Sequence, residues 1–177
     1  DHIAGVICAS GINQDGASNG ITAPNGTAQE QLIQSVYQQF NIVPTTISYM
    51  EAHGTGTKLG DPVEANALTR AFKRFTSQQQ YCAVGSAKSH IGHTSAAAGV
   101  IGLIKILLSM RHEYLPALLH FKQLNPLIEF ADSPFYINAQ GTPWPAQPDK
   151  PRYAALNSFG HSGTNAHCVI RDYVAPT

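Results

Sequence analysis

The chain has 177 residues, of which 43% are hydrophobic and 12% are charged. This composition is typical of a globular protein and excludes a disordered one, and the length fits one well-buried domain. The 11 basic residues balance the 11 acidic ones and form no basic block. A nucleic-acid binder is therefore excluded, and no nucleic-acid partner is expected.

The cysteines, the longest apolar run and the N-terminus indicate in which cellular compartment the protein is expected. Cys8, Cys82 and Cys168 form no CxxC pair, and Cys8 and Cys82 lie in apolar, strand-like runs, which indicates reduced thiols in an intracellular protein. The longest apolar run, residues 96–108, contains a lysine and is too short to cross a bilayer. We expect a soluble, cytoplasmic protein without a membrane partner. Since Asp1 is neither an initiating methionine nor part of a signal-like region, we expect it to be a cut rather than a natural start.

In chain order, residues 3–12 predict a strand, followed by the turn-rich segment NQDGASNGITAPNG. Thr27 is predicted to cap a helix, with Glu30 in the capping-box position. The apolar residues of this helix recur at helical spacing, which predicts a buried stripe. They are Leu32, Ile33, Val36, Tyr37 and Phe40.

A second strand is predicted over residues 47–52, and a second helix begins at Asp61 with Pro62 in its first position. The predicted buried stripe of this helix consists of Leu68, Ala71, Phe72 and Phe75. Residues 81–87 predict a third strand. Strand and helix thus alternate, and we predict a parallel α/β sheet.

The third helix is predicted to begin near Thr94 or Ser95. Because it is apolar nearly all round, we expect it to lie between layers, with Gly99 and Gly102 allowing close approach of another backbone. After Met110 the prolines predict a long irregular stretch. Residues 152–173 then predict a pair of strands joined by the Gly-rich loop SFGHSGTN.

Two of the predicted loops combine histidines with a lysine. HGTGTKLGD, residues 53–61, and KSHIGHT, residues 88–94, each follow a strand and precede a helix. The carboxyl ends of parallel strands meet at one edge of a sheet, so we expect His53 and His93 to stand side by side. Two neutral imidazoles that donate N–H would form a hole for a developing oxyanion. An enolate or a tetrahedral thioester adduct is the kind of species that needs such a hole.

Other interpretations of these motifs are weaker. His90 and His93 have the spacing of half a metal site, but no Cys, Asp or Glu follows at ligand spacing, so no metal is expected. GTGTKLG departs from both phosphate-loop patterns. GHSGT ends in Thr164 where the serine-hydrolase elbow requires glycine. Lys88 is either a solvated charge or, as we favour, a partner for a carboxylate such as Glu64.

Four segments carry a resemblance to a known family: NQDGASNGITAPNG, EAHGTGTKLGDPVEANAL, GSAKSHIGHTSAAAGVIGLIK and NSFGHSGTNAHCVI. Together, and in this order, they closely resemble the C-terminal half of the β-ketoacyl synthase (ketosynthase) domain of modular polyketide and type I fatty acid synthases. The resemblance implies an α/β, thiolase-like fold with layered helices and a mixed sheet. It also implies decarboxylation of a malonyl unit on an acyl carrier protein and Claisen condensation with an acyl chain.

The resemblance also implies roles for individual residues. His53 and His93 match the catalytic pair, and Lys88 matches the supporting lysine, with Glu64 and Asp61 as further supporting residues. The remaining matches concern the substrate. Thr22, Thr55 and Thr57 fall where the family contacts the phosphopantetheine arm, and Gly160, His161 and Gly163 fall in the loop that lines the acyl pocket.

Two departures from the family pattern stand out. The nucleophilic cysteine, in a TACSS-like sequence at a helix N-terminus, is absent, so residues 1–177 are interpreted as a single C-terminal domain, inactive alone, that lacks its N-terminal half. His161 replaces the usual apolar gate residue, which gives the hypothesis of an oxygenated or short acyl chain, and His90 stands where asparagine is common.

The expected partners are the missing half, an acyl carrier protein and a second copy in a homodimer of the complete domain. No cofactor is expected on this chain, because the substrate is carried on phosphopantetheine. Two alternatives remain open. One is a non-catalytic half that binds carrier proteins or stabilises a dimer, and the other is an enzyme of the same fold that acts on coenzyme A thioesters.

Overall fold

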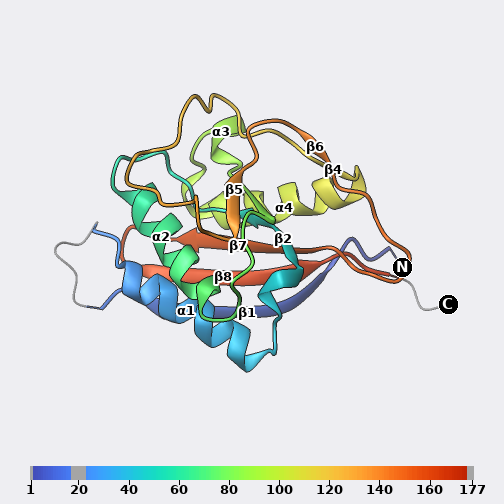
Figure 1. Ribbon diagram of the computed structural model, residues 1–177, viewed down its shortest axis with the longest axis horizontal. Coiled ribbons are helices and arrows are strands. Elements are labelled where there is room, and N and C mark those ends of the chain that lie inside the picture. Colours follow the sequence, from blue (N-terminus) through green and yellow to red (C-terminus); the bar gives the residue numbers. More distant parts are fainter. Residues whose placement is uncertain (1, 17–22, 175–177) are drawn as a thin grey trace.

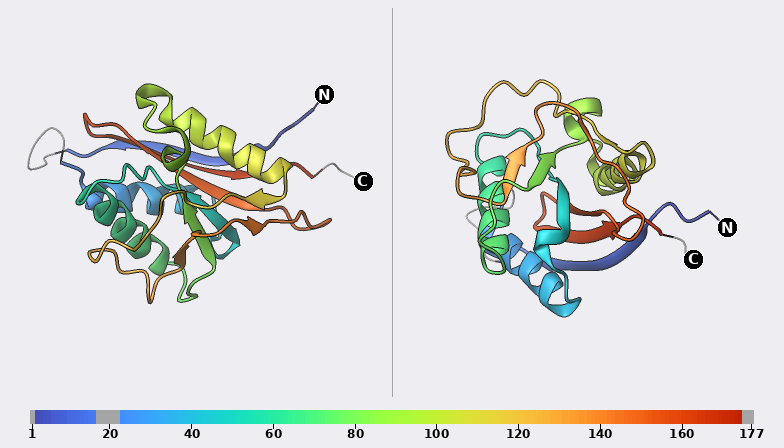
Figure 2. Two further views of the ribbon diagram at one scale, coloured as in Figure 1. Left: turned by 90° about the horizontal axis from the view of Figure 1, so that it is seen from above. Right: turned by 45° about the vertical axis from the view of Figure 1, so that its right-hand side comes forward.

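The computed structural model describes residues 2–16 and 23–174, and in them a six-stranded sheet carries helices on both faces (Figures 1 and 2). The strand order is β1-β8-β7-β2-β3-β5. Its strands are β1 (Val6–Gln14), β2 (Ile47–Glu51), β3 (Cys82–Gly85), β5 (Phe135–Ile137), β7 (Tyr153–Phe159) and β8 (Thr164–Arg171). A second, two-stranded sheet pairs β4 (Tyr114–Leu115) with β6 (Thr142–Pro143). The α-helices are α1 (Gly26–Gln39), α2 (Gly60–Lys73), α3 (Lys88–Ile91) and α4 (Ala98–Arg111), and 3₁₀ turns cover Pro44–Thr46 and Ser95–Ala97.

The sheet is mixed because one strand runs against the others. β7, β2, β3 and β5 pair in parallel, whereas β8 is antiparallel to both β7 and β1. β1 therefore points the same way as the parallel strands. The parallel sheet that the alternation of strands and helices predicted does not include β8, since a short loop can join two neighbouring strands only as an antiparallel pair. The mixed sheet that the family resemblance implied is confirmed.

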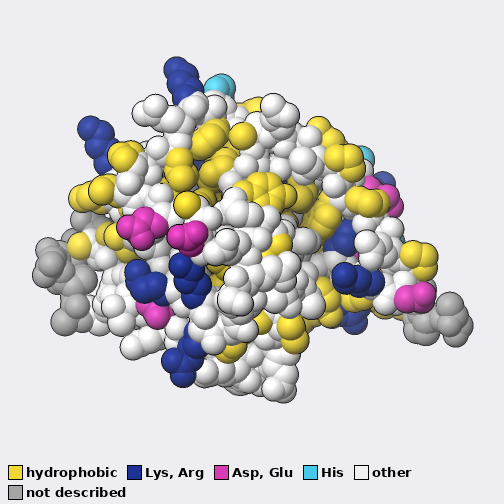
Figure 3. Space-filling view, in the orientation of Figure 1, with side chains coloured by type: hydrophobic (Ala, Val, Ile, Leu, Met, Phe, Trp, Pro, Cys, Tyr) yellow, Lys and Arg dark blue, Asp and Glu magenta, His cyan; other side chains and the backbone are white. Residues whose placement is uncertain are grey.

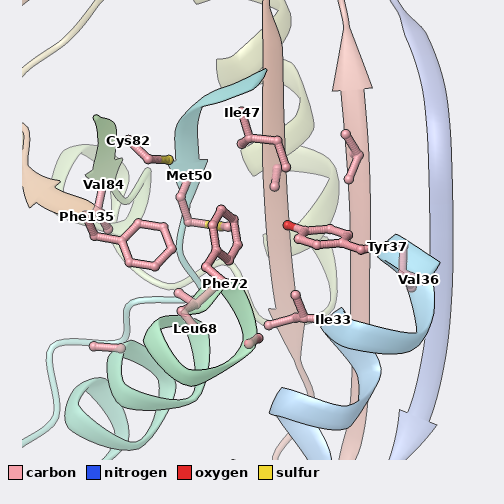
Figure 4. Close-up of a cluster of buried hydrophobic side chains, with 14 of the residues drawn as sticks. Ile33, Val36, Tyr37, Ile47, Met50, Leu68, Phe72, Cys82, Val84 and Phe135 are labelled. Carbon is pink, nitrogen blue, oxygen red and sulfur yellow. The ribbon is translucent and has the colours of Figure 1, made fainter. Parts of the chain in front are cut away.

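One face of the sheet is covered by α1 and α2 (Figure 2). The predicted stripes are buried there except at their ends, and Figure 4 shows Ile33, Val36 and Tyr37 of α1 facing the strands. Phe40 is 41% exposed because α1 ends one residue before it. Phe75 is only partly buried.

The predicted cap of the first helix is wrong by two residues. Asn25 is the N-cap, and its side-chain oxygen accepts from the backbone N–H groups of Thr27 at 3.0 Å and Ala28 at 3.2 Å. Glu30 does not close a capping box but pairs with Arg70 of α2 at 2.6 Å. Asn is as good a cap as Thr, so the pattern alone could not separate the two positions.

The opposite face of the sheet carries α4. Its Ile106 and Met110 are buried in one cluster with Tyr49 of β2, Ala154 of β7 and Trp144, which follows β6. A Cβ added at Gly102 would lie 2.6 Å from a side-chain methyl of Leu156, so the glycine there admits a side chain of the sheet and not the close backbone that was predicted. In the described residues the helix is not enclosed between layers as predicted, since Val100, Ile104 and Leu108 are 59%, 45% and 47% exposed.

The segments around α4 differ from the sequence prediction in detail. The expected loop over residues 88–94 contains the one-turn helix α3, and a 3₁₀ turn at Ser95–Ala97 precedes α4. Within the stretch predicted as irregular, β5 pairs with β3 and extends the main sheet. β5 has three residues between prolines and loops, too few to show a strand pattern. The strand pair β7–β8 is confirmed.

The surface agrees with the balanced composition. On the face shown in Figure 3, Lys and Arg are interspersed with Asp and Glu, and no extended region of one sign appears. Among residues 2–16 and 23–174, no helix has both the length and the apolar character needed to span a membrane.

Candidate active site

The sheet brings the predicted loops together at one edge. β1, β2, β3 and β7 point the same way, so the loops that follow them leave the sheet at the same edge. His53 follows β2, Lys88 and His93 follow β3, and Gly160 follows β7. The rings of His53 and His93 have centroids 5.5 Å apart and an interplanar angle of 82°. The predicted juxtaposition of the two histidines is therefore present.

Backbone amides set the tautomer of both rings. The N–H of Phe159 donates to Nδ1 of His53 at 3.2 Å, and the N–H of Ser95 donates to Nδ1 of His93 at 3.0 Å. Because each Nδ1 accepts a hydrogen bond, the proton of each neutral ring is assigned to Nε2. The two Nε2–H groups are then free to donate to a third atom.

His53 is held in its neutral form. Burial lowers the pKa of His53 from 6.5 to about 4, and the nearby Lys88 ammonium and His93 act in the same direction. An imidazole with this pKa is uncharged at neutral pH. It can therefore donate one hydrogen bond without carrying a charge of its own.

Lys88 supports His53 in a different way from the one predicted. Its ammonium donates to the backbone carbonyl of His53, and Nζ lies 3.4 Å from Nδ1 of the same residue. Lys88 forms no ion pair with Glu64, so that part of the prediction is wrong. Burial lowers the pKa of Lys88, while the charges of Glu64, Glu51 and Asp61 oppose this shift. Lys88 thus joins α3 to the loop that carries His53.

Two carboxylates of α2 hold the backbone of the same loop. Glu64 is buried and accepts from the N–H groups of His53 at 2.8 Å and Gly54 at 2.9 Å. Asp61 accepts from the N–H of Gly56 at 3.0 Å. Desolvation raises the pKa of both carboxyl groups, and the hydrogen bonds from the loop oppose that shift. Both carboxylates contact the loop rather than the histidine rings.

A cavity of about 870 Å³ opens over the two histidines. Of the predicted site residues, those that line it are His53, Thr55, Thr57, Glu64, His93, Gly160 and His161. Lys88 and Asp61 instead line a smaller cavity of about 280 Å³ on the other side of the loop. Gly163, at φ +93°, lies beside Asp15 and does not line the large cavity, and Thr22 lies outside the described residues.

His90 and the three cysteines do not line the cavity over the two histidines. His90 lines an apolar groove beside α4 rather than the histidine cavity. In the ranges 2–16 and 23–174, no group of three or more His, Cys, Asp and Glu has metal-binding geometry. Cys8, Cys82 and Cys168 do not line the large cavity, and burial raises the pKa of each thiol.

Sequence reasoning missed several groups that build the site. The N–H groups of Phe159 and Ser95 fix the rings, and the Asn157 amide donates to Glu64 at 2.9 Å. Every residue except proline has a backbone N–H, so the residue types in a sequence do not show which of these groups serve as donors in a site. Asn157 lies in the quoted motif NSFGHSGTN, but its partner Glu64 is 93 positions away.

Known proteins are similar to this chain over nearly its whole length. Residues 4–122 match the family model of the β-ketoacyl synthase, C-terminal domain. The chain is 53% identical over 173 residues to polyketide synthase PksL of Bacillus subtilis (strain 168), covering 98% of this chain and 4% of that protein. It is 44% identical over 174 residues to polyketide synthase GfsA of Streptomyces halstedii, covering 98% of this chain and 2% of that protein.

Solved structures show the same relation. A cysteine-to-serine mutant of the ketosynthase from module 6 of the Bacillus subtilis bacillaene synthase superimposes with a TM-score of 0.97 and 52% identity, over 100% of this chain and 31% of that chain. The oxazolomycin ketosynthase domain from Streptomyces albus gives 0.92 and 39%, over 99% of this chain and 31% of that chain. The fold is the thiolase-like fold of the ketosynthases, and this chain spans only a part of each relative.

Proposed function

Because this chain belongs to the β-ketoacyl synthase family, as the C-terminal domain of a ketosynthase, we propose that it supplies the histidine half of a condensing active site. The reaction is the decarboxylative Claisen condensation of an acyl chain with a malonyl unit on an acyl carrier protein. The observation that carries this proposal is the pair of Nε2–H donors of His53 and His93, which border one cavity.

The chemistry requires donors of this kind. Loss of carbon dioxide breaks the bond between the malonyl carboxylate and Cα, and its electron pair forms an enolate whose charge rests on the thioester oxygen. The enolate carbon then attacks the acyl thioester, and a thiolate leaves. Each negatively charged oxygen is stabilised by preorganised N–H groups, and removing one such donor costs about 2.7 to 4 kcal/mol of transition-state stabilisation.

The phosphopantetheine arm is assigned to the same cavity. Thr55 and Thr57 are exposed at its lining, and their hydroxyl oxygens lie 3.4 Å apart. Such hydroxyls can donate to and accept from the amides of a pantetheine chain. Gly160 and His161 line the same cavity, which supports a role of this loop in contacting the acyl chain.

The acyl-accepting cysteine is proposed to come from an N-terminal half. The thiols of this chain stay protonated and none borders the histidine cavity, so none can serve as a thiolate nucleophile there. The outer face of α4 supports the presence of such a half, because Val100, Ile104 and Leu108 expose an apolar surface that another layer would cover. A homodimer of the complete domain is part of the same proposal.

The test is carbon dioxide release from a malonyl thioester of an acyl carrier protein. The chain is assayed alone, with the N-terminal half of its ketosynthase, and with that half carrying serine in place of the nucleophilic cysteine. We expect release only when the two halves are combined. If both halves are folded and associated but release nothing, the chain has the binding or dimer-stabilising role instead. Release of carbon dioxide from malonyl-coenzyme A at an equal rate would favour an enzyme that acts on coenzyme A thioesters.

A further inference from the structure

A line of buried side chains runs from α1 to the loop that carries His53. The hydroxyl of Tyr37 lies 3.2 Å from Nε2 of His167, and Nδ1 of His167 lies 2.6 Å from Oδ1 of Asn157. The Asn157 amide nitrogen donates to Glu64 at 2.9 Å. All these residues are at most 5% exposed. Figure 4 shows Tyr37 extending from α1 with its hydroxyl oxygen over the strands.

The chemistry of each group fixes the direction of the hydrogen bonds. Oδ1 of Asn157 can only accept, so the proton of the His167 ring is on Nδ1. Burial lowers the pKa of His167 to about 3, so the ring is neutral and Nε2 accepts from the Tyr37 hydroxyl. Burial also raises the pKa of Tyr37, which keeps that hydroxyl protonated. His167 therefore presents a donor to Asn157 and to no other side chain.

The donor of His167 determines which way the Asn157 amide faces. With Oδ1 bound to His167, the amide nitrogen faces Glu64 and donates to it. If the amide turned over, its oxygen would face the Glu64 carboxylate, and two acceptors would be in contact. Glu64 is the acceptor for the backbone N–H groups of His53 and Gly54, so a displaced carboxylate would release that part of the loop.

We propose that His167 is a positioning residue for His53, acting through the orientation of the Asn157 amide and the Glu64 carboxylate. The expected effect of His167 on catalysis rests on the proposed function, whereas its expected effect on the position of the His53 loop does not. His167 does not line the histidine cavity, so it has no contact with a substrate there. An apolar side chain in the same buried space would leave the Tyr37 hydroxyl and Oδ1 of Asn157 without their partner, so the imidazole is distinguished by these two hydrogen bonds, and only the bond to Asn157 leads on to Glu64.

The first experiment compares two variants of equal size in the complete ketosynthase. His167→Asn keeps an N–H donor near the position of Nδ1, whereas His167→Leu has none. We expect His167→Leu to lower the kcat of malonyl decarboxylation about 10-fold to 100-fold with little change in KM, as for a misplaced catalytic group. We expect His167→Asn to restore most of the rate. A residue that only fills space would give the reverse order or no difference.

A second readout does not depend on activity. Hydrogen exchange of the backbone amides is followed by mass spectrometry in a peptide that spans residues 52–58. His167→Leu should accelerate exchange at His53 and Gly54, and His167→Asn should not. If the wild-type ketosynthase releases no carbon dioxide, the proposed function fails, and the exchange comparison still decides the positioning role. Equal exchange in both variants would overturn it.

A double-mutant cycle tests the route through Asn157. In an Asn157→Leu background, His167→Leu should cause no further loss of kcat, because the intermediate link is already absent. Additive losses would show that His167 acts by another route and would overturn the proposal. Thermal midpoints identify variants that do not fold, and His167→Met is a second donor-free variant for that case.

Discussion

At the scale of single residues, His53 and His93 are held by the same kind of hydrogen bond. A backbone N–H occupies Nδ1 of His53 and of His93, so the ring nitrogen that remains available carries a proton. The rings differ in exposure, because His53 is partly buried between β2, β7 and Lys88 whereas His93 is exposed. A neutral, oriented donor at His53 follows from this burial.

A matched pair of substitutions tests the donor role of His93. His93→Gln places an amide N–H near the position of Nε2, whereas His93→Leu offers no donor. In the complete ketosynthase, we expect His93→Leu to reduce the kcat of carbon dioxide release about 10²-fold to 10³-fold. His93→Gln should retain a larger part of the rate. If both variants match the wild type, the Nε2–H of His93 does not stabilise the enolate.

The depressed pKa values of His53 and His167 predict a pH dependence of stability. Their folded-state pKa values are about 4 and about 3, both below the ordinary value of 6.5. Below pH 6.5 the unfolded chain binds protons that the folded chain does not, so stability present above pH 6.5 is lost as the pH falls towards 4. Chemical unfolding of the complete ketosynthase between pH 7.5 and about 4.5 measures this change. The slope should be shallower in His167→Asn, and an equal slope would contradict this origin.

At the scale of elements, the loop between β2 and α2 depends on two glycines in the left-handed region. Gly54 has φ +47° and Gly56 has φ +75°. A Cβ at position 54 would lie 2.9 Å from the Cβ of Ser86, whereas at position 56 no atom lies within 4 Å. Both positions disfavour other residues through their backbone angles, but only Gly54 is also constrained by a neighbouring loop.

This difference gives a prediction for the loop. Gly54→Ala should displace the backbone between His53 and Ser86 and lower the kcat of decarboxylation about tenfold or more. Gly56→Ala carries a similar backbone penalty, of about 1 kcal/mol, without the contact, and serves as the matched control. Steady-state rates and thermal midpoints of both variants are compared. Equal losses of rate would show that the approach to Ser86 does not matter for the site.

At the scale of the whole molecule, α4 leaves one side of the sheet incompletely covered. The exposed residues Ile104 and Leu108 lie on its outer face, four positions apart along the helix. Exposed apolar side chains at neighbouring positions are typical of a surface that binds another protein layer. The proposed N-terminal half is the layer that this surface would bind.

Charged side chains introduced on the outer face of α4 should prevent association with the N-terminal half without preventing the chain from folding. We expect Ile104→Lys combined with Leu108→Lys to abolish co-purification with the N-terminal half while the chain keeps its circular dichroism spectrum. Phe40→Lys is the control, since Phe40 is similarly exposed at the end of α1 on the other side of the sheet. Association that survives the double substitution would place the contact elsewhere. Association lost with Phe40→Lys as well would indicate a general effect of added charge.

The elements with long periodic patterns could be predicted from the amino-acid sequence, and so could the meeting of the two main loops. The stripes of α1 and α2, the strands β1, β2 and β3, and the β7–β8 pair follow from local spacing, because each pattern is contained within one element. His53 and His93 could be expected to meet because both follow parallel strands. Their motifs also carried the family resemblance.

The groups that complete the site could be identified only from the three-dimensional arrangement of the chain. Lys88 donates to a backbone carbonyl, and Glu64 accepts from backbone N–H groups. Almost any residue offers such groups, so the sequence could not show that these contacts replace the predicted ion pair between Lys88 and Glu64. The line from Tyr37 through His167 to Asn157 joins residues up to 130 positions apart. Such contacts depend on the order of strands in the sheet, and a local pattern does not contain that order.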